Sequence, residues 1–157
     1  MSRLRSDHYA FPCFDVAATD RFYRDVMGFP LVLAMSGPSP EWGGDFLLIA
    51  YAAGDGRCLD FFSFRGLRRP PADGLPDDIR HVAFTAGSAR AVARWKLRLA
   101  ERDVAYRIED HGEGDEHLYF ADPNGLMLEI AARGDAPGVR SESRSARRVL
   151  QRWIAQS

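Results

Sequence analysis

Two histidines and two carboxylates occupy equivalent places in an internal repeat. His8 opens a His-Tyr-Ala-Phe segment and His81 opens a His-Val-Ala-Phe segment. Each segment is later followed by an acid just after a glycine turn, Asp60 in the first half and Glu129 in the second. Two neutral imidazoles with one or two carboxylates suit a divalent metal such as Fe(II), Mn(II), Ni(II) or Zn(II). His, His and Glu with open positions are also the ligand set of oxygen-activating iron enzymes.

The four residues lie in strand-like segments, where alternate side chains share a face. If equivalent strands of the two halves curve around one cleft, the four polar groups converge there. A single histidine or glutamate in a strand is more often structural than a ligand. Here, however, a histidine stands at the start of both modules and an acid stands at the equivalent later position of both. His8, His81 and Glu129 are therefore the predicted metal ligands. Asp60 is the candidate fourth ligand, or a catalytic group, because its shorter side chain either reaches the metal or acts through water.

The repeat predicts an α+β fold of two βαβββ modules. The first module spans 7–66, a proline-rich linker covers 67–79, and the second module spans 80–133. The expected elements of the first module are a strand at 8–14, a helix at 16–27 ended by Gly28, and strands at 29–35, 46–52 and 57–64, with a loop at 36–44. Those of the second are a strand at 80–85, a helix N-capped by Ser88, and strands at 104–108, 118–121 and 126–132.

Two further segments carry strong local signals. The run Asp122-Pro123-Asn124-Gly125 predicts a hairpin turn, since proline presets φ and glycine accepts positive φ. In the tail, 134–157, apolar residues recur at helical spacing between arginines, which predicts an amphipathic helix packed on its own domain or on a second subunit. No cysteine stands at either repeated position, which argues against a closed structural zinc site.

Composition limits the class of protein. The 157 residues are 46% hydrophobic and 27% charged, as in a soluble globular protein. A net charge of −1 gives no reason to expect nucleic acid or an anionic membrane as partner. No apolar stretch approaches the ~20 residues that span a bilayer. Two cysteines, Cys13 and Cys58, are too few for a disulfide framework, so we expect a cytoplasmic protein.

The pattern of metal-binding residues resembles the vicinal oxygen chelate superfamily, which includes glyoxalase I, extradiol dioxygenases and bleomycin-binding proteins. The run 22–29, Phe-Tyr-Arg-Asp-Val-Met-Gly-Phe, looks like that superfamily's first-helix exit, and 122–129 looks like its final hairpin. The resemblance covers about 8–132. It implies paired modules around a cupped, mixed β-sheet and a divalent metal that chelates two adjacent oxygens of a small substrate. His8, His81 and Glu129 match the ligand positions.

The reaction has three candidate interpretations. The spacing of His111, Tyr119 and Glu129 is similar to an extradiol dioxygenase signature, which implies Fe(II) and roles for His111 and Tyr119 beside bound oxygen and substrate. No histidine between His8 and His81 corresponds to the acid-base histidine of those enzymes. A glyoxalase I-like lyase or isomerase would use Asp60 and Glu129 to move a proton.

The third interpretation is a metal-free binding protein of the bleomycin-resistance type, holding a planar ligand in an aromatic cup. That cup consists of Trp42, Phe46, Phe62 and Phe64. The candidate substrate-binding residues of the enzyme interpretations are Trp42, Phe62 and Phe64 together with Arg57, which would hold an anionic substrate. The three metal ligands argue against a simple binder. We therefore expect a dioxygenase-like homodimer first and a glyoxalase-like one second.

Overall fold

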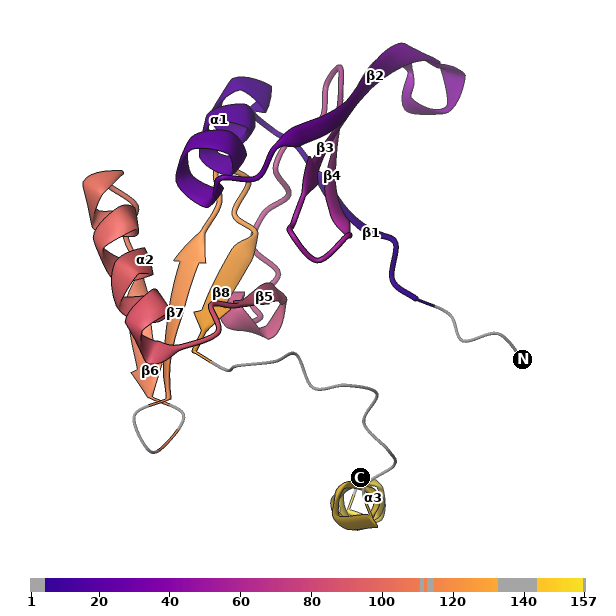
Figure 1. The fold of residues 1–157 in the computed structure, drawn as a ribbon. Helices are drawn as coiled ribbons and strands as arrows, with labels where there is room; N and C mark the ends of the chain where they lie inside the picture. The colour runs from indigo at the N-terminus through magenta and orange to yellow at the C-terminus, as the bar shows by residue number, and fades with distance from the viewer. Residues whose placement is uncertain (1–4, 111, 113–114, 133–143, 157) are drawn as a thin grey trace.

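The computed structural model describes residues 5–110, 112, 115–132 and 144–156. Its strands form two four-stranded sheets, in the orders β1-β4-β3-β2 and β5-β8-β7-β6 (Figure 1). The first module contains β1 (His8–Pro12), α1 (Val16–Arg21), a π-helix η1 (Phe22–Met27), β2 (Leu31–Ser39), η2 (Pro40–Trp42), β3 (Gly44–Ala52) and β4 (Cys58–Phe64). The remaining elements are η3 (Asp77–Ile79), β5 (His81–Thr85), α2 (Ala89–Glu101), β6 (Arg107–Asp110), β7 (Glu116–Ala121), β8 (Met127–Ala131) and α3 (Arg144–Ile154). The predicted α+β fold with two βαβββ units and a C-terminal helix is confirmed.

Several predicted boundaries were wrong for identifiable reasons. β2 continues to Ser39 through the expected glycine- and proline-rich loop, because its backbone pairs with β3 as far as Gly44. The second strand of the second module, β6, starts at Arg107 rather than at 104. The amide of Val104 donates to the carbonyl of Leu99 at 2.9 Å, which keeps this segment in the C-terminal turn of α2. Gly28 has the predicted positive φ, 74°, at the end of η1.

The two sheets repeat the same register around the candidate acids. β1 runs parallel to β4 and places Ala10 opposite Asp60. β5 runs parallel to β8 and places Ala83 opposite Glu129. Each acid therefore lies on an inner strand of its sheet, beside the strand that carries the histidine.

One hydrophobic core joins the two modules. Tyr23 of η1 is fully buried at its centre, 4.7 Å between ring centroids from Phe61 and 5.3 Å from Tyr51. The second module contributes residues such as Leu118 and Phe120 from β7 to the same core. Side chains alternate along a strand. In each sheet, the candidate site residues therefore project from the face that points away from this core.

Three side chains tie the modules together by hydrogen bonds. Asn124, in the turn between β7 and β8, accepts a bond of 2.8 Å from the amide of Phe14. The Tyr23 hydroxyl donates to Asp122 at 3.1 Å, and Arg98 of α2 donates to the carbonyl of Val26 at 2.5 Å. Gly125 has a φ of 84°, as the predicted turn requires. The turn therefore also fixes how the first module sits against the second.

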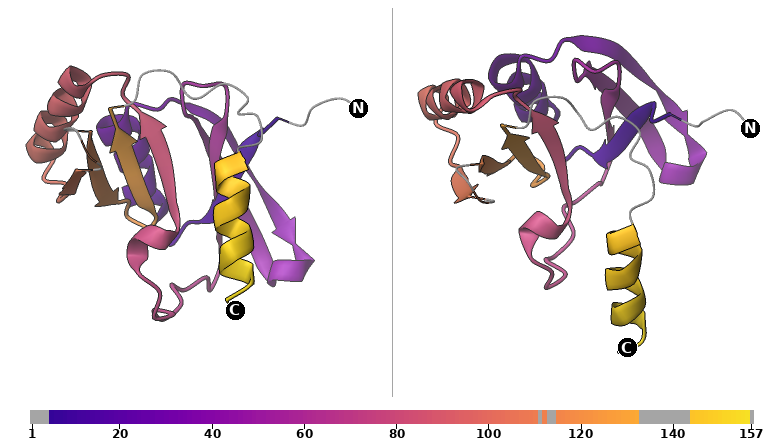
Figure 2. Two further views of the ribbon diagram at one scale, coloured as in Figure 1. Left: turned by 90° about the horizontal axis from the view of Figure 1, so that it is seen from below. Right: turned by 60° about the horizontal axis from the view of Figure 1, so that its bottom comes forward.

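The predicted C-terminal amphipathic helix is α3. Figure 1 and the right-hand view of Figure 2 show it apart from the two sheets. Its large apolar side chains each expose more than half of their surface, and they are Val149, Leu150, Trp153 and Ile154. Within the described ranges, none of the helices has the length and apolar character to cross a membrane.

Candidate metal-binding site

The second module holds its histidine and acid in direct contact. His81 Nε2 lies 2.8 Å from Glu129 Oε2, and Glu129 is only 6% exposed. On the other side of the ring, His81 Nδ1 lies 2.6 Å from the backbone carbonyl oxygen of Asp78. Since a carbonyl only accepts, Nδ1 carries a hydrogen and Nε2 is the nitrogen directed at Glu129. An imidazole oriented in this way by an oxygen acceptor is typical of metal-binding histidines.

Tyr119 of β7 borders this pair. It lies opposite Glu129 in the register, and its ring meets that of His81 edge to face at 5.9 Å. Burial, and then the nearby Glu129 carboxylate, raise the pKa of the Tyr119 hydroxyl. Arg107 lies over the same ring, 4.4 Å from its centroid. The hydroxyl therefore keeps its proton and can donate a hydrogen bond beside the Glu129 carboxylate. The other predicted catalytic residue, His111, lies outside the described residues.

His117 is a member of this cluster that sequence analysis did not select. Its Nδ1 hydrogen bonds to Glu129 Oε1, and it is only 4% exposed. The sequence does contain a signal, because His117 precedes Tyr119 by two positions on a strand and so shares its face.

The first module arranges its histidine and acid differently. His8 Nδ1 lies 2.9 Å from Asp7 Oδ2, which leaves Nε2 available. The bond to Asp7, followed by the Asp60 carboxylate, raises the pKa of His8. Asp60 is 8% exposed, and among the described residues its Oδ1 has no hydrogen-bond partner. Burial raises the pKa of Asp60, and nearby His8 partly opposes the effect.

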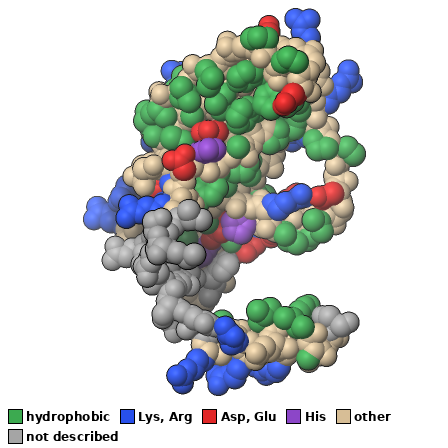
Figure 3. Space-filling model, turned by 90° about the vertical axis from the view of Figure 1, so that its right-hand side faces the viewer, with side chains coloured by type: hydrophobic (Ala, Val, Ile, Leu, Met, Phe, Trp, Pro, Cys, Tyr) green, Lys and Arg blue, Asp and Glu red, His purple; other side chains and the backbone are tan. Residues whose placement is uncertain are grey.

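The two pairs do not meet within one chain. Figure 3 shows histidine and carboxylate side chains together at two separate places on one face. Among the residues that the structure describes, no three or more His, Cys, Asp and Glu side chains are grouped to hold one ion. The predicted convergence of four ligands is therefore absent from the described part of a single chain.

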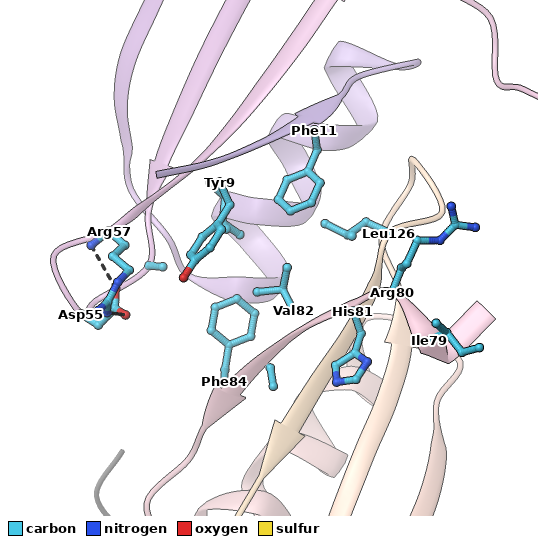
Figure 4. Close-up of a pocket in the computed structure, with 13 residues that line it drawn as sticks. Tyr9, Phe11, Asp55, Arg57, Ile79, Arg80, His81, Val82, Phe84 and Leu126 are labelled. Atoms are coloured by element: carbon cyan, nitrogen blue, oxygen red, sulfur yellow. Dashed lines mark hydrogen bonds and ion pairs between the residues drawn. The ribbon is translucent and has the colours of Figure 1, made fainter. Parts of the chain in front are cut away.

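A cleft of about 600 Å³ lies between β1 and β5, the strands that carry the two candidate histidines. In Figure 4, Tyr9 of β1 points toward Phe84, while Phe11 points toward Val82 and Leu126. The two strands thus run in opposite directions across the cleft. The start of β1 lies near the end of β5, so His8 and His81 lie toward opposite ends.

The predicted substrate-binding residues fall into two places. Trp42 stacks on Phe64 with ring centroids 5.5 Å apart, and it meets Phe62 edge to face at 5.7 Å. A hollow of about 570 Å³ lies against Trp42 and Phe62, on the face of β4 that carries Asp60. Arg57 instead lines the cleft between β1 and β5 and pairs with Asp55. The structure therefore groups the three aromatic residues but not Arg57.

The donor types present fit a divalent cation. Each candidate histidine has its Nδ1 occupied by an oxygen atom, and each module adds one buried carboxylate. The unpartnered, buried Oδ1 of Asp60 is the kind of atom that a cation or a donor would satisfy. Imidazole and carboxylate ligands suit Fe(II), Mn(II), Ni(II) and Zn(II) alike.

Comparisons with known proteins give the same fold. Lactoylglutathione lyase from Agrobacterium tumefaciens has 23% identity and a TM-score of 0.60, covering 83% of this chain and 95% of that chain. A glyoxalase family protein from Enterococcus faecalis has 26% identity and a TM-score of 0.59, covering 81% and 96%. The oxidase ChaP-H2 has 25% identity and a TM-score of 0.59, covering 87% and 99%.

A search of curated proteins found no match. Residues 5–130, which include every predicted metal ligand and both sheets except the last residue of β8, match a family model. The chain therefore belongs to the Glyoxalase/Bleomycin resistance protein/Dioxygenase superfamily.

Proposed function

We propose that this protein is a metal-dependent enzyme that acts as a homodimer. One ion is held by His8 and Asp60 of one copy and by His81 and Glu129 of a second copy. The observation that carries the proposal is the repeated register, which places a histidine and an acid equivalently in both modules while one chain keeps the pairs apart. A bound divalent ion would polarise two adjacent oxygens of a small substrate.

The two carboxylates favour proton transfer as the reaction, in a glyoxalase-like isomerase or lyase. A base that takes a proton from carbon and returns it works best when its pKa approaches the working pH. Burial raises the pKa of Asp60, and its Oδ1 has no partner among the described residues, so Asp60 suits that role. The aromatic residues Trp42, Phe62 and Phe64 offer an apolar wall on the same face. The similar fold of a lactoylglutathione lyase is consistent with this choice.

An extradiol-dioxygenase-like reaction is the second candidate. The observation that favours it is the position of the Tyr119 hydroxyl beside the His81–Glu129 pair, where it can donate to a chelated substrate oxygen. The likeness to an oxidase adds support. Against it, no histidine lies between His8 and His81 to act as acid and base in the first module.

Mixed dimers test whether two copies share the site. One copy carries His8→Ala and Asp60→Ala, the other carries His81→Ala and Glu129→Ala, and two affinity tags isolate the heterodimer. Ni²⁺ binding is measured by equilibrium dialysis against wild type and both mutant homodimers. A shared site predicts half of the wild-type metal content in the heterodimer and almost none in either homodimer. A heterodimer as empty as the mutant homodimers would overturn the shared site.

The reaction is tested on protein loaded separately with Fe²⁺, Ni²⁺ or Zn²⁺. Turnover of a hemithioacetal without oxygen consumption, abolished by Asp60→Asn, supports the isomerase. Oxygen uptake with a catechol, retained in Asp60→Asn, supports the oxygenase instead. If wild type binds none of these ions and His81→Ala keeps the affinity for an aromatic ligand, the enzyme proposal is wrong and a binding protein is correct.

A further inference from the structure

We propose that His117 is a positioning residue that fixes the Glu129 carboxylate for metal binding. The inference rests on the proposed function, because it assumes that Glu129 is a ligand. His117 itself does not contact the ion in this proposal.

Glu129 lies between two imidazoles. Its Oε2 meets His81 Nε2, and its Oε1 is bonded to His117 Nδ1. An ionised carboxylate can only accept, so His117 Nδ1 must donate in this bond. On the far side of the ring, His117 Nε2 lies 3.2 Å from Asp115 Oδ2. Holding Oε1 in this way removes rotation of the carboxylate and leaves Oε2 directed at the His81 side.

The burial of the cluster makes this contact strong. His117 is 4% exposed and Glu129 is 6% exposed, so water competes little for either partner. A hydrogen bond between a buried donor and a carboxylate is stronger than one between neutral groups. Residues that support a metal ligand in this way typically change metal affinity by about 10- to 100-fold.

The first module has no such support for its acid. In the registers, His117 pairs with Ala131, two residues after Glu129, and Leu48 pairs with Phe62, two residues after Asp60. Leu48 therefore occupies the place equivalent to His117 and offers no hydrogen bond. The second sheet thus holds Glu129 in one orientation through His117. In the first sheet, Oδ1 of Asp60 has no partner among the described residues.

Metal titration of site variants tests the inference. Co²⁺ is the probe, its dissociation constant comes from competition with a fluorescent chelator, and the visible spectrum reports the ligand geometry. His117→Leu removes the donor, whereas His117→Asn keeps an amide N–H where Nδ1 stands. We expect Co²⁺ affinity to fall about 10- to 100-fold in His117→Leu with a changed spectrum, and to recover to within about 3-fold of wild type in His117→Asn.

Two controls separate positioning from folding. Glu116→Gln alters the adjacent residue, whose partner is Lys96 at 2.6 Å, and should leave Co²⁺ affinity unchanged. In a Glu129→Gln background, His117→Leu should cause no further loss, because the carboxylate it orients is gone. Asp115→Asn, at a more exposed site, should weaken binding in the same direction if His117→Leu does not fold.

The outcomes distinguish the two proposals. Suppose that wild type binds Co²⁺ and that His117→Leu folds and keeps the wild-type Co²⁺ affinity and spectrum. This result would overturn the positioning role of His117 but would leave the proposed metal site intact. An equal loss in both the wild-type and Glu129→Gln backgrounds would also overturn it. Wild type that binds no Co²⁺ refutes the proposed function, and the positioning role with it.

Discussion

Asn124 offers the sharpest test of how the modules are joined. Its side chain is 8% exposed and makes three hydrogen bonds that reach both modules. Oδ1 accepts from the Phe14 amide at 2.8 Å, while Nδ2 donates to Thr19 Oγ1 at 3.0 Å and to Asp122 Oδ2 at 3.1 Å. The perturbation is Asn124→Ala, which removes all three bonds and leaves the turn residue Gly125 in place.

The size of the effect follows from those bonds. Each contributes about 1 kcal/mol net, somewhat more where the acceptor is a carboxylate, and the Phe14 amide loses its acceptor. We therefore expect Asn124→Ala to lower the free energy of unfolding by about 3 kcal/mol. For a chain of this length, that corresponds to a melting temperature lower by about 6–12 °C. Tyr23→Phe, which removes the single bond to Asp122, should lose about half as much.

Urea unfolding of metal-free protein, followed by fluorescence and circular dichroism, measures both variants. Protein concentration is held constant, because the proposed dimerisation would add to apparent stability. If Asn124→Ala costs less than about 0.5 kcal/mol, or less than Tyr23→Phe, then the hydrogen bonds of Asn124 do not hold the modules together and the reasoning fails.

Two further predictions concern the proposed metal ligands. Burial raises the pKa of Asp60, so the folded state binds the carboxyl proton of Asp60 more tightly than the unfolded chain does. Protonated Asp60 therefore adds to the free energy of unfolding at low pH. This stabilisation is lost as pH rises through the raised pKa of the folded state. Asp60→Asn should therefore stabilise metal-free protein at neutral pH and flatten its dependence on pH in urea titrations; a parallel dependence contradicts this. His8→Ala and His81→Ala should each weaken Ni²⁺ binding by more than about 100-fold, above the range for residues that only support a ligand. Wild-type affinity in either variant, measured by chelator competition, removes that histidine from the site.

Much of the fold was predictable because the chain repeats itself. The repeated His-x-Ala-Phe segments mark β1 and β5, and glycines at turns mark where elements end. The errors arose where long-range pairing overrides composition. Gly37 and Pro38 suggest a loop, yet they lie in β2 because β3 pairs with their backbone.

The candidate site was predictable as two pairs but not as an assembled whole. Alternation along strands places Asp60 and Glu129 on the face of each sheet that points away from the shared hydrophobic core. The separation of the pairs depends on how β1 and β5 cross the cleft, which no local pattern encodes. The role of His117 was missed for a similar reason, because its contact with Glu129 depends on the pairing of β7 with β8.

Equivalent positions in the two modules need not have equal chemistry, since the neighbouring strand decides what each acid meets. Asp60 faces Ala50 across β3, whereas Glu129 faces Tyr119 across β7. An acid beside an apolar neighbour loses hydration and gains affinity for a proton, while an acid beside hydrogen-bond donors is held in one orientation. A metal site that contains both acids would combine Glu129, a ligand held in one orientation, with Asp60, a group able to carry a proton. The proposed proton-transfer reaction would use that difference, which arises from residues on β3 and β7 rather than from the repeated motif itself.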